Sequence, residues 1–290
     1  MPLLVEKYRP KSLDEMVGFV PTFSIDEDMP HLLLAGGAGT GKTTLAKIII
    51  RMLNAESIVL NASAERGIDT VRDKIKTFAS TQSTNSGIKV VFLDEGDHLT
   101  PDAQTALRNT METYSRNTRF IITCNYLQRI IDPIQSRCVL IKFDNIPKSA
   151  IINRLRYICN QENIPYEEAA LAKIVEYTNS DIRSAINKIE ENKSGVTVAK
   201  ITENTGVAKQ VFNCISKNEF ESARSIYLET KPEPEQFIKD LYGVIWSDSK
   251  NLEYNKKALL EIAETYKWIR QVAWPEILLE ALIYKLINIK

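Results

Sequence analysis

The stretch GGAGTGKTT, residues 36–44, carries the residue types best suited to chemistry. It fits the pattern G-x-x-x-x-G-K-[ST], with Gly36, Gly41, Lys42 and Thr43 at the fixed positions. Glycines let successive backbone N–H groups curl around a phosphate chain, and a helix N-terminus adds partial positive charge. The alternative, a glycine-rich turn that binds nothing, is disfavoured because the match is complete.

We therefore predict a site for ATP and Mg²⁺ at this loop. Lys42 would contact the β- and γ-phosphates, and the Thr43 hydroxyl would coordinate Mg²⁺. The loop residues predicted to hold the nucleotide are Gly37, Ala38, Gly39, Thr40, Gly41, Lys42, Thr43 and Thr44.

Polar side chains also end two later apolar runs. KVVFLDE (89–95) ends in Asp94 and Glu95, and FIITCN (120–125) ends in Asn125. Asp94 would hold Mg²⁺ through water, and Glu95 would act as general base toward an attacking water. An Asn125 amide would hydrogen-bond the γ-phosphate or that water. Two acidic residues that simply end a strand, and a turn-forming asparagine, are the alternatives.

Five short apolar runs supply the elements that must position these groups. They are HLLLAG (31–36), SIVLNAS (57–63), KVVFLDE (89–95), RFIITCN (119–125) and CVLIKF (138–143). Nearly continuous apolar runs predict strands buried on both faces, as in a parallel sheet covered by helices. Helical patterns alternate with them at 43–53, 68–79 and 101–112, the last with Thr100 as N-cap before Pro101. This alternation predicts an α/β doubly wound domain.

After residue 144 the strand patterns stop. Helices are predicted at 151–160, 168–177 and 181–190, followed by a linker at 192–197. Further helices are predicted at 207–216, 219–229, 235–247, 254–270 and 275–288. We expect three domains: an α/β domain over 1–145, a small helical domain over 146–203 and an all-helical domain over 204–290.

Bulk composition excludes several classes of protein. Of 290 residues, 44% are hydrophobic and 26% charged, values typical of a globular chain. Because 37 basic residues balance 37 acidic ones, nucleic-acid contacts would need a local patch. Four cysteines without CxxC spacing and two isolated histidines indicate neither a disulfide framework nor a zinc site. Without a signal peptide or an apolar run of membrane length, a cytoplasmic location is expected, or a nuclear one in a eukaryote.

Beyond the loop, several blocks resemble the small subunit of sliding-clamp loaders, the replication factor C group of AAA+ ATPases. They are VEKYRPKSLDEMVG (5–18), LNASAERGID (60–69), AQTALRNTME (103–112), QSRC (135–138) and SDIRSAIN (180–187). The resemblance implies an AAA+ ATPase domain, a helical lid and a collar bundle. It also implies a pentameric ring, built with a large subunit and further copies of this chain, that loads a sliding clamp onto primer–template DNA.

This resemblance assigns roles to residues beyond the loop. Asn125 would be the first sensor, and Arg183 a second sensor that touches the γ-phosphate of its own subunit. An exposed helical arginine is the alternative for Arg183. Tyr8, Arg9 and Val17 would flank the adenine and ribose.

Arginines outside the loop receive roles toward other molecules. Arg137 directly precedes the run CVLIKF, and the resemblance makes it an arginine finger for the ATP of a neighbouring subunit; pairing with a local carboxylate is the alternative. Arg72 and Lys76, four residues apart on one helix, would contact the DNA backbone without reading sequence. An ordinary solvated face explains them as well. Arg108 would link the DNA-facing helix to the ATP site, or be a structural ion-pair residue.

Two competing functions remain open at this level. A branch-migration helicase of the AAA+ class is disfavoured because the C-terminal region looks entirely helical. A non-hydrolysing scaffold subunit is disfavoured because Lys42, Thr43, Asp94 and Glu95 are all present. One departure from the family pattern stands next to these groups, since Gly96 occupies a position that is usually alanine.

Overall fold

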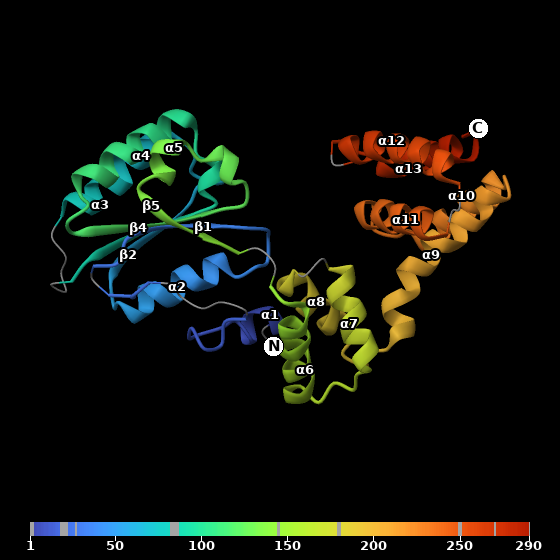
Figure 1. The fold of residues 1–290 in the computed structure, drawn as a ribbon, viewed down its shortest axis with the longest axis horizontal. Helices are drawn as coiled ribbons and strands as arrows, with labels where there is room; N and C mark the ends of the chain where they lie inside the picture. Colours follow the sequence, from blue (N-terminus) through green and yellow to red (C-terminus); the bar gives the residue numbers. More distant parts are fainter. Residues whose placement is uncertain are drawn as a thin grey trace. The chain divides into compact units, whose positions relative to one another are not determined.

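Five parallel strands form one sheet in the order β2-β3-β4-β1-β5 (Figure 1). They are β1 (His31–Ala35), β2 (Glu56–Asn61), β3 (Lys89–Asp94), β4 (Thr118–Cys124) and β5 (Cys138–Lys142), so each apolar run became a strand as predicted. This computed structural model describes residues 3–17, 23–26, 28–81, 87–143, 146–178, 181–248, 251–269 and 271–289. Because all strands run the same way, the residues after β1, β3 and β4 meet at one edge of the sheet.

Burial differs between the centre and the edges of the sheet. Leu33 of β1 and Phe92 of β3 are fully buried. The prediction that every strand is buried on both faces is wrong for β2 and β5. Val59 of β2 is 53% exposed, and Val139 and Leu140 of β5 are each 38% exposed. Both strands lie at a sheet edge, where they have a strand neighbour on one side only.

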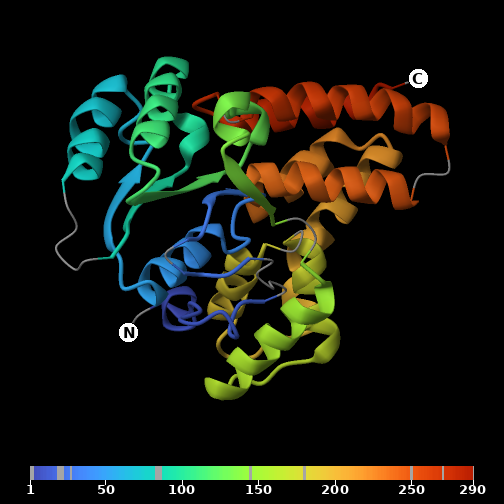
Figure 2. The ribbon, with the colours of Figure 1, turned by 60° about the vertical axis from the view of Figure 1, so that its left-hand side comes forward.

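Helices cover both faces of the sheet (Figures 1 and 2). On one face, α2 (Lys42–Met52) packs its buried Leu45 and Ile49 against β1, β3 and β4. On the other face lie α4 (Pro101–Thr113) and a helical segment made of a π-helix (Thr70–Ile75) continued by α3 (Lys76–Ser80). The predicted cap is present, because the Thr100 hydroxyl accepts a hydrogen bond from the Ala103 N–H. Short turns η2 (Gly96–His98), η3 (Leu127–Arg129) and α5 (Asp132–Gln135) follow strand or helix ends.

A small helical group completes the first compact unit, Met1–Val196. It consists of α6 (Lys148–Gln161), α7 (Glu168–Tyr177), α8 (Ile182–Glu191) and the short N-terminal α1 (Leu4–Lys7), which packs on α8. We call α6–α8 the lid. The predicted linker at 192–197 is wrong in part: Val196 is fully buried, donates to the Pro165 carbonyl (2.8 Å) and accepts from the Glu167 N–H (2.9 Å).

The second compact unit spans Thr197–Lys290. It contains α9 (Val198–Ser216), α10 (Phe220–Thr230), α11 (Pro234–Asp248), α12 (Leu252–Trp268) and α13 (Pro275–Ile287). Helix α9 begins nine residues earlier than predicted, so the boundary expected at 203/204 falls inside a helix. Within the described part of the chain, no helix combines the length and apolar character needed to cross a membrane.

Candidate nucleotide-binding site

Lys42 is the first residue of α2 and directly follows the loop that leaves β1. Its Nζ donates to the carbonyls of Gly36 (2.8 Å) and Gly37 (2.6 Å) and to Asn125 Oδ1 (3.0 Å). Burial lowers the pKa of the Lys42 ammonium, Asp94 opposes this shift, and the Arg183 cation adds to it. The structure thus brings together Lys42 and Asn125, which are 83 residues apart.

Two loop glycines adopt left-handed backbone conformations, Gly39 with φ +70° and Gly41 with φ +102°. Gly39 also touches the lid, since a Cβ there would lie 1.7 Å from Asp181 Oδ1. Asp181 is the N-cap of α8, and its Oδ1 accepts a hydrogen bond from the Ser184 N–H (3.0 Å). The phosphate loop and the first turn of α8 are therefore in contact.

A chain of hydrogen bonds orders the predicted metal and base residues. The Thr43 hydroxyl donates to Asp94 Oδ1 (3.0 Å), and the Thr123 hydroxyl donates to the same oxygen (2.6 Å). The Glu95 N–H in turn donates to Thr123 Oγ1 (2.9 Å), and Glu95 has φ +58°. Thr123 was not predicted, although a hydroxyl inside the apolar run FIITC is the signal that could have found it.

The donor set at this place fits Mg²⁺. A hydroxyl and a carboxylate are oxygen ligands, and Mg²⁺ typically takes one or two protein carboxylates together with substrate phosphates. Over the described ranges, no three His, Cys, Asp or Glu side chains gather to hold a metal without other ligands. Thr43 and Asp94 would therefore hold Mg²⁺ together with the phosphates of a nucleotide.

Asp97, which sequence analysis did not single out, fixes the turn that carries Asn125. It is buried, and its carboxylate accepts from the N–H groups of Asn125 (3.3 Å) and Tyr126 (3.2 Å). Gly96 precedes it with no room for a side chain, because a Cβ would lie 2.5 Å from Ile122 Cγ2. Close packing on β4 therefore accounts for glycine at this position.

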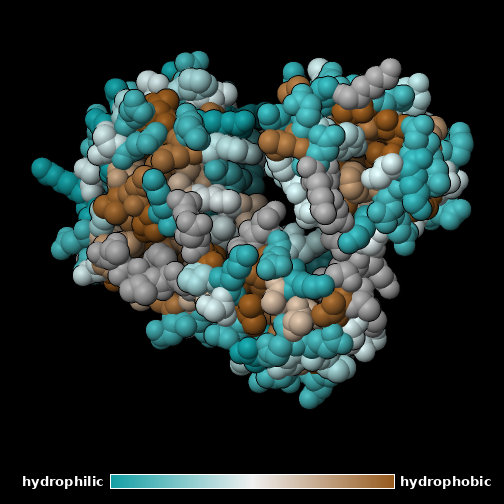
Figure 3. Space-filling model, turned by 45° about the vertical axis from the view of Figure 1, so that its right-hand side comes forward, coloured by the Kyte–Doolittle hydropathy of each residue, from teal (hydrophilic) through white to brown (hydrophobic). Residues whose placement is uncertain are grey.

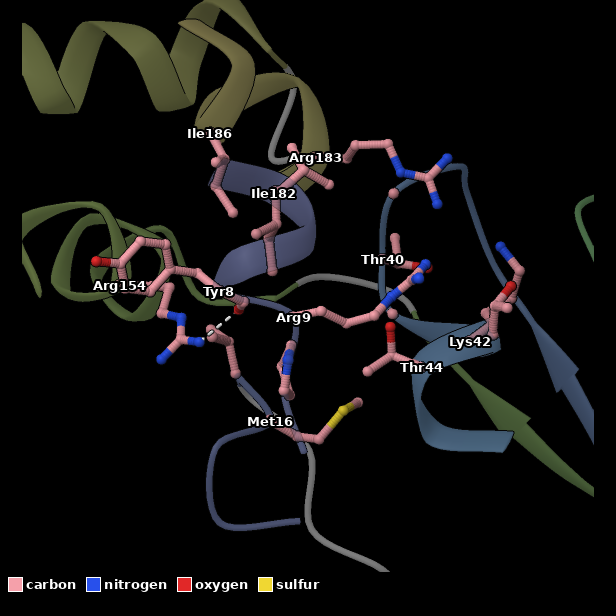
Figure 4. Close-up of a pocket in the computed structure, with 16 residues that line it drawn as sticks. Tyr8, Arg9, Met16, Thr40, Lys42, Thr44, Arg154, Ile182, Arg183 and Ile186 are labelled. Carbon is pink, nitrogen blue, oxygen red and sulfur yellow. Dashed lines mark hydrogen bonds between the residues drawn. The ribbon is translucent and has the colours of Figure 1, made fainter. Parts of the chain in front are cut away.

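One pocket joins the loop to the N-terminal segment and the lid (Figure 4). The predicted residues Tyr8, Arg9, Val17 and Arg183 line it, as do the loop residues Gly39 to Thr44. Gly37 and Ala38 do not line the pocket. The Gly37 carbonyl accepts hydrogen bonds from Lys42 and Thr40, and Ala38 is exposed. Sequence analysis missed the remaining lining residues, which are Val5, Pro10, Met16, Arg154, Ile182 and Ile186.

The two ends of this pocket differ in character. Ile182 and Ile186 offer apolar surfaces away from the loop, suited to the faces of a base, and Met16 adds an apolar surface against the loop at Gly41. Figure 4 shows the side chains of Arg9 and Arg183 extending toward the loop. The arrangement suits a molecule with a flat apolar end and an anionic end.

Arg137 lies outside this pocket and is paired within its own chain. Its guanidinium forms an ion pair with Glu112 and donates to the Pro133 carbonyl (2.7 Å). Arg108 stands 4.0 Å from the same Glu112 oxygen and donates to Asn109 Oδ1 (2.7 Å). Pairing with a local carboxylate, the alternative given for Arg137, is therefore present in the form of Glu112. The role of Arg137 toward a neighbouring subunit stays a prediction.

Arg72 and Lys76 are both exposed, in the π-helix and at the start of α3. Exposure agrees equally with a contact to DNA and with a solvated face, so their role also stays a prediction.

Comparison with known proteins places these features in a family. The model of the AAA family, ATPases associated with various cellular activities, matches residues 32–144. The replication factor C small subunits of Sulfurisphaera tokodaii and Saccharolobus solfataricus are each 38% identical over 309 residues, covering 98% of this chain and 94% of theirs. That of Thermofilum pendens is 48% identical over 200 residues, covering 65% of this chain and 62% of that one.

Solved structures also resemble this chain. The Holliday junction branch migration motor RuvB of Thermotoga maritima has a TM-score of 0.55 and 18% identity, covering 94% of this chain and 91% of that one. At this identity the likeness concerns the fold alone.

Proposed function

Because the chain belongs to the replication factor C small-subunit family of AAA ATPases, we propose that it is the ATPase subunit of a DNA sliding-clamp loader. The observation that carries the proposal is a pair of hydrogen bonds, from Lys42 to Asn125 and from Thr43 to Asp94. These residues come from the loop and from the ends of two neighbouring strands. Lys42 and Thr43 line the phosphate end of a pocket whose other end suits a base, and Asn125 and Asp94 contact these two residues.

ATP is the proposed substrate. Lys42 would leave its carbonyl partners to contact the β- and γ-phosphates, and the amide of Asn125 would orient the γ-phosphate or the attacking water. Glu95 would accept the proton of that water as it attacks phosphorus, with ADP as the leaving group. Mg²⁺ held by Thr43 and Asp94 would supply positive charge at the phosphate oxygens. Arg183 would contact the γ-phosphate from the lid.

Assembly would complete the site. Arg137 does not line the nucleotide pocket of its own chain. We propose that it contacts the ATP bound to the adjacent subunit in a pentameric ring that includes a large subunit. Helices α12 and α13 and the residue before α13 supply surface for contacts, because Leu260, Trp274 and Ile277 are 71%, 71% and 65% exposed. On the face drawn in Figure 3, brown hydrophobic residues lie at the surface among hydrophilic ones. Exposed apolar residues that form one contiguous patch are typical of protein–protein contacts.

The ring would act on a sliding clamp and on primer–template DNA. Arg72, Lys76 and Arg108 would contact phosphates of the DNA backbone, which requires no base sequence. We propose that this happens in the cytoplasm, or in the nucleus of a eukaryote.

The test is steady-state ATP hydrolysis, first by this chain alone and then with its large subunit, the clamp and primed DNA. We expect hydrolysis to rise when clamp and DNA are both present. Branch migration of a four-way junction without any clamp would contradict the proposal and favour a different AAA motor. Equal hydrolysis with and without clamp and DNA would also contradict it.

A further inference from the structure

The N-terminal segment Leu4–Arg9 forms one wall of the nucleotide pocket, yet it is fastened to the lid. The Leu4 N–H donates to Glu190 Oε2 of α8 (3.0 Å). Glu162, the residue that ends α6, accepts hydrogen bonds from Lys7 Nζ (2.5 Å) and from the Tyr8 hydroxyl. These three contacts all go to the lid and none goes to the sheet.

Directly after this segment, the chain contacts α2 and the phosphate loop instead of the lid. The Lys11 carbonyl accepts a hydrogen bond from Arg51 at the end of α2 (3.3 Å), and Met16 lies against the loop at Gly41. Arg9 and Pro10 therefore bridge two supports, the lid on one side and the α2 side of the sheet on the other. Both residues line the pocket.

Arg154 of α6 makes the contact nearest to the pocket. Its Nη2 donates to the main-chain carbonyl of Tyr8 (2.7 Å), and its guanidinium lies over the Tyr157 ring at 5.3 Å. The Tyr8 and Tyr157 rings meet edge to face at 6.2 Å. Figure 4 shows Arg154 reaching Tyr8 from the side away from Thr40 and Lys42, so Arg154 lines the pocket far from the phosphate loop and holds the Tyr8 main chain there.

We propose that Arg154 and Glu162 are positioning residues for the nucleotide, because they hold Leu4–Arg9 where it closes the base end of the pocket. The opposite wall of that end is Ile182 and Ile186 of α8, which belong to the same lid. Both walls of the base end thus belong to the lid or are attached to it, while the phosphate end belongs to the loop. This inference rests on the proposed function, since it concerns the affinity of the same site for ATP.

The experiment compares two ligands, ATP and inorganic tripolyphosphate, each in Mg²⁺ and each measured by displacement of a fluorescent ATP analogue. Tripolyphosphate has no base, so it probes the phosphate end alone. In Arg154→Ala we expect the Kd for ATP to rise about tenfold, as the loss of one hydrogen bond from a charged donor predicts. The Kd for tripolyphosphate should stay unchanged.

Two further variants separate positioning from direct contact. Arg154→Lys keeps a charged donor and should restore part of the ATP affinity. Glu162 does not line the pocket, but Glu162→Gln should weaken its hydrogen bonds to Lys7 and Tyr8. The affinity for ATP should therefore fall, by a smaller factor than in Arg154→Ala. In the assembled complex, Arg154→Ala and Glu162→Gln should both raise the KM for ATP and leave kcat within about twofold of the wild-type value.

Arg156→Ala is the matched control. Arg156 lies on the same helix, pairs with Glu168 of α7 at 2.7 Å and does not line the pocket. This variant should bind both ligands as the wild type does.

Three results would overturn the inference. They are an unchanged Kd for ATP in Arg154→Ala, an equal loss of ATP and tripolyphosphate affinity, and a loss in Arg156→Ala as large as in Arg154→Ala. A wild-type chain that binds tripolyphosphate and not ATP would instead refute the proposed function, and the inference with it.

Discussion

Replacing Arg137 by alanine tests the most consequential assignment, because two readings of this residue predict effects of very different size. Arg137 and Glu112 form an ion pair whose side chains are 34% and 46% exposed. Exposed pairs of this kind contribute about 0–1 kcal/mol to the free energy of unfolding. If the residue is only structural, Arg137→Ala should lower the melting temperature by a few degrees at most and leave hydrolysis intact.

The role toward a neighbouring subunit predicts a much larger effect on rate. An arginine that stabilises charge on the transferring phosphoryl group contributes about 10³–10⁵ in rate, equivalent to about 4–7 kcal/mol in the activation barrier. That exceeds the whole contribution of the exposed ion pair. Stability and rate therefore separate the two roles in one variant.

The assay is single-turnover hydrolysis by the reconstituted complex with clamp and primed DNA, together with thermal unfolding and nucleotide affinity of the isolated chain. We expect hydrolysis at the adjacent site to fall by about 10³ or more, with nucleotide affinity of the mutated chain unchanged. Arg156→Ala, which removes another exposed pair, should leave all three measurements near wild type.

Two outcomes would refute this reasoning. One is a complex that hydrolyses ATP at the wild-type rate with Arg137→Ala in every copy. The other is a mixed complex in which only the mutated subunit's own site fails.

Three further changes have defined outcomes. Glu95→Gln should bind ATP as tightly as wild type while single-turnover hydrolysis falls about 10²–10⁴-fold, because the general base is lost; normal hydrolysis would show that Glu95 is not the base. Gly96→Ala should cost about 1–3 kcal/mol in urea unfolding, because its Cβ would lie 2.5 Å from Ile122 Cγ2, and an unchanged midpoint would contradict this packing. Burial lowers the pKa of His31 to about 4, below the ordinary 6.5, so the folded state binds fewer protons than the unfolded state between these values. The contribution of His31 to the free energy of unfolding should therefore be fully present above pH 6.5 and fall by about 3 kcal/mol as the pH drops to 4. In urea unfolding measured across this pH range, His31→Gln should remove this part of the pH dependence. A pH dependence equal to that of the wild type would count against the assignment.

The phosphate end of the site could be predicted from sequence because its geometry is local. The loop motif fixes the backbone around Lys42, and parallel strands bring the residues after β3 and β4 to the same edge. Asp94 and Asn125, which are 31 positions apart in the sequence, therefore contact the neighbouring residues Thr43 and Lys42. Residue type and spacing were sufficient to predict that these side chains lie near one another, and their binding of a nucleotide stays a prediction.

The base end could not be predicted in the same way. Arg154 contacts the Tyr8 carbonyl across 146 positions of sequence, and this contact depends on how the lid packs. An arginine on an amphipathic helix carries no mark of such a partner. Likewise, the run CVLIKF has the composition of a buried strand, and only the order of strands in the sheet places β5 at an edge.

The contact between Gly39 and Asp181 limits how the loop can change during evolution. A side chain at position 39 would meet the backbone restriction at φ +70° and the carboxylate of Asp181 at the same time. Moving that carboxylate away would uncap α8. Positions 39 and 181 should therefore vary together among relatives, and a phosphate loop grafted from another protein should be tolerated here only when it keeps glycine at this position.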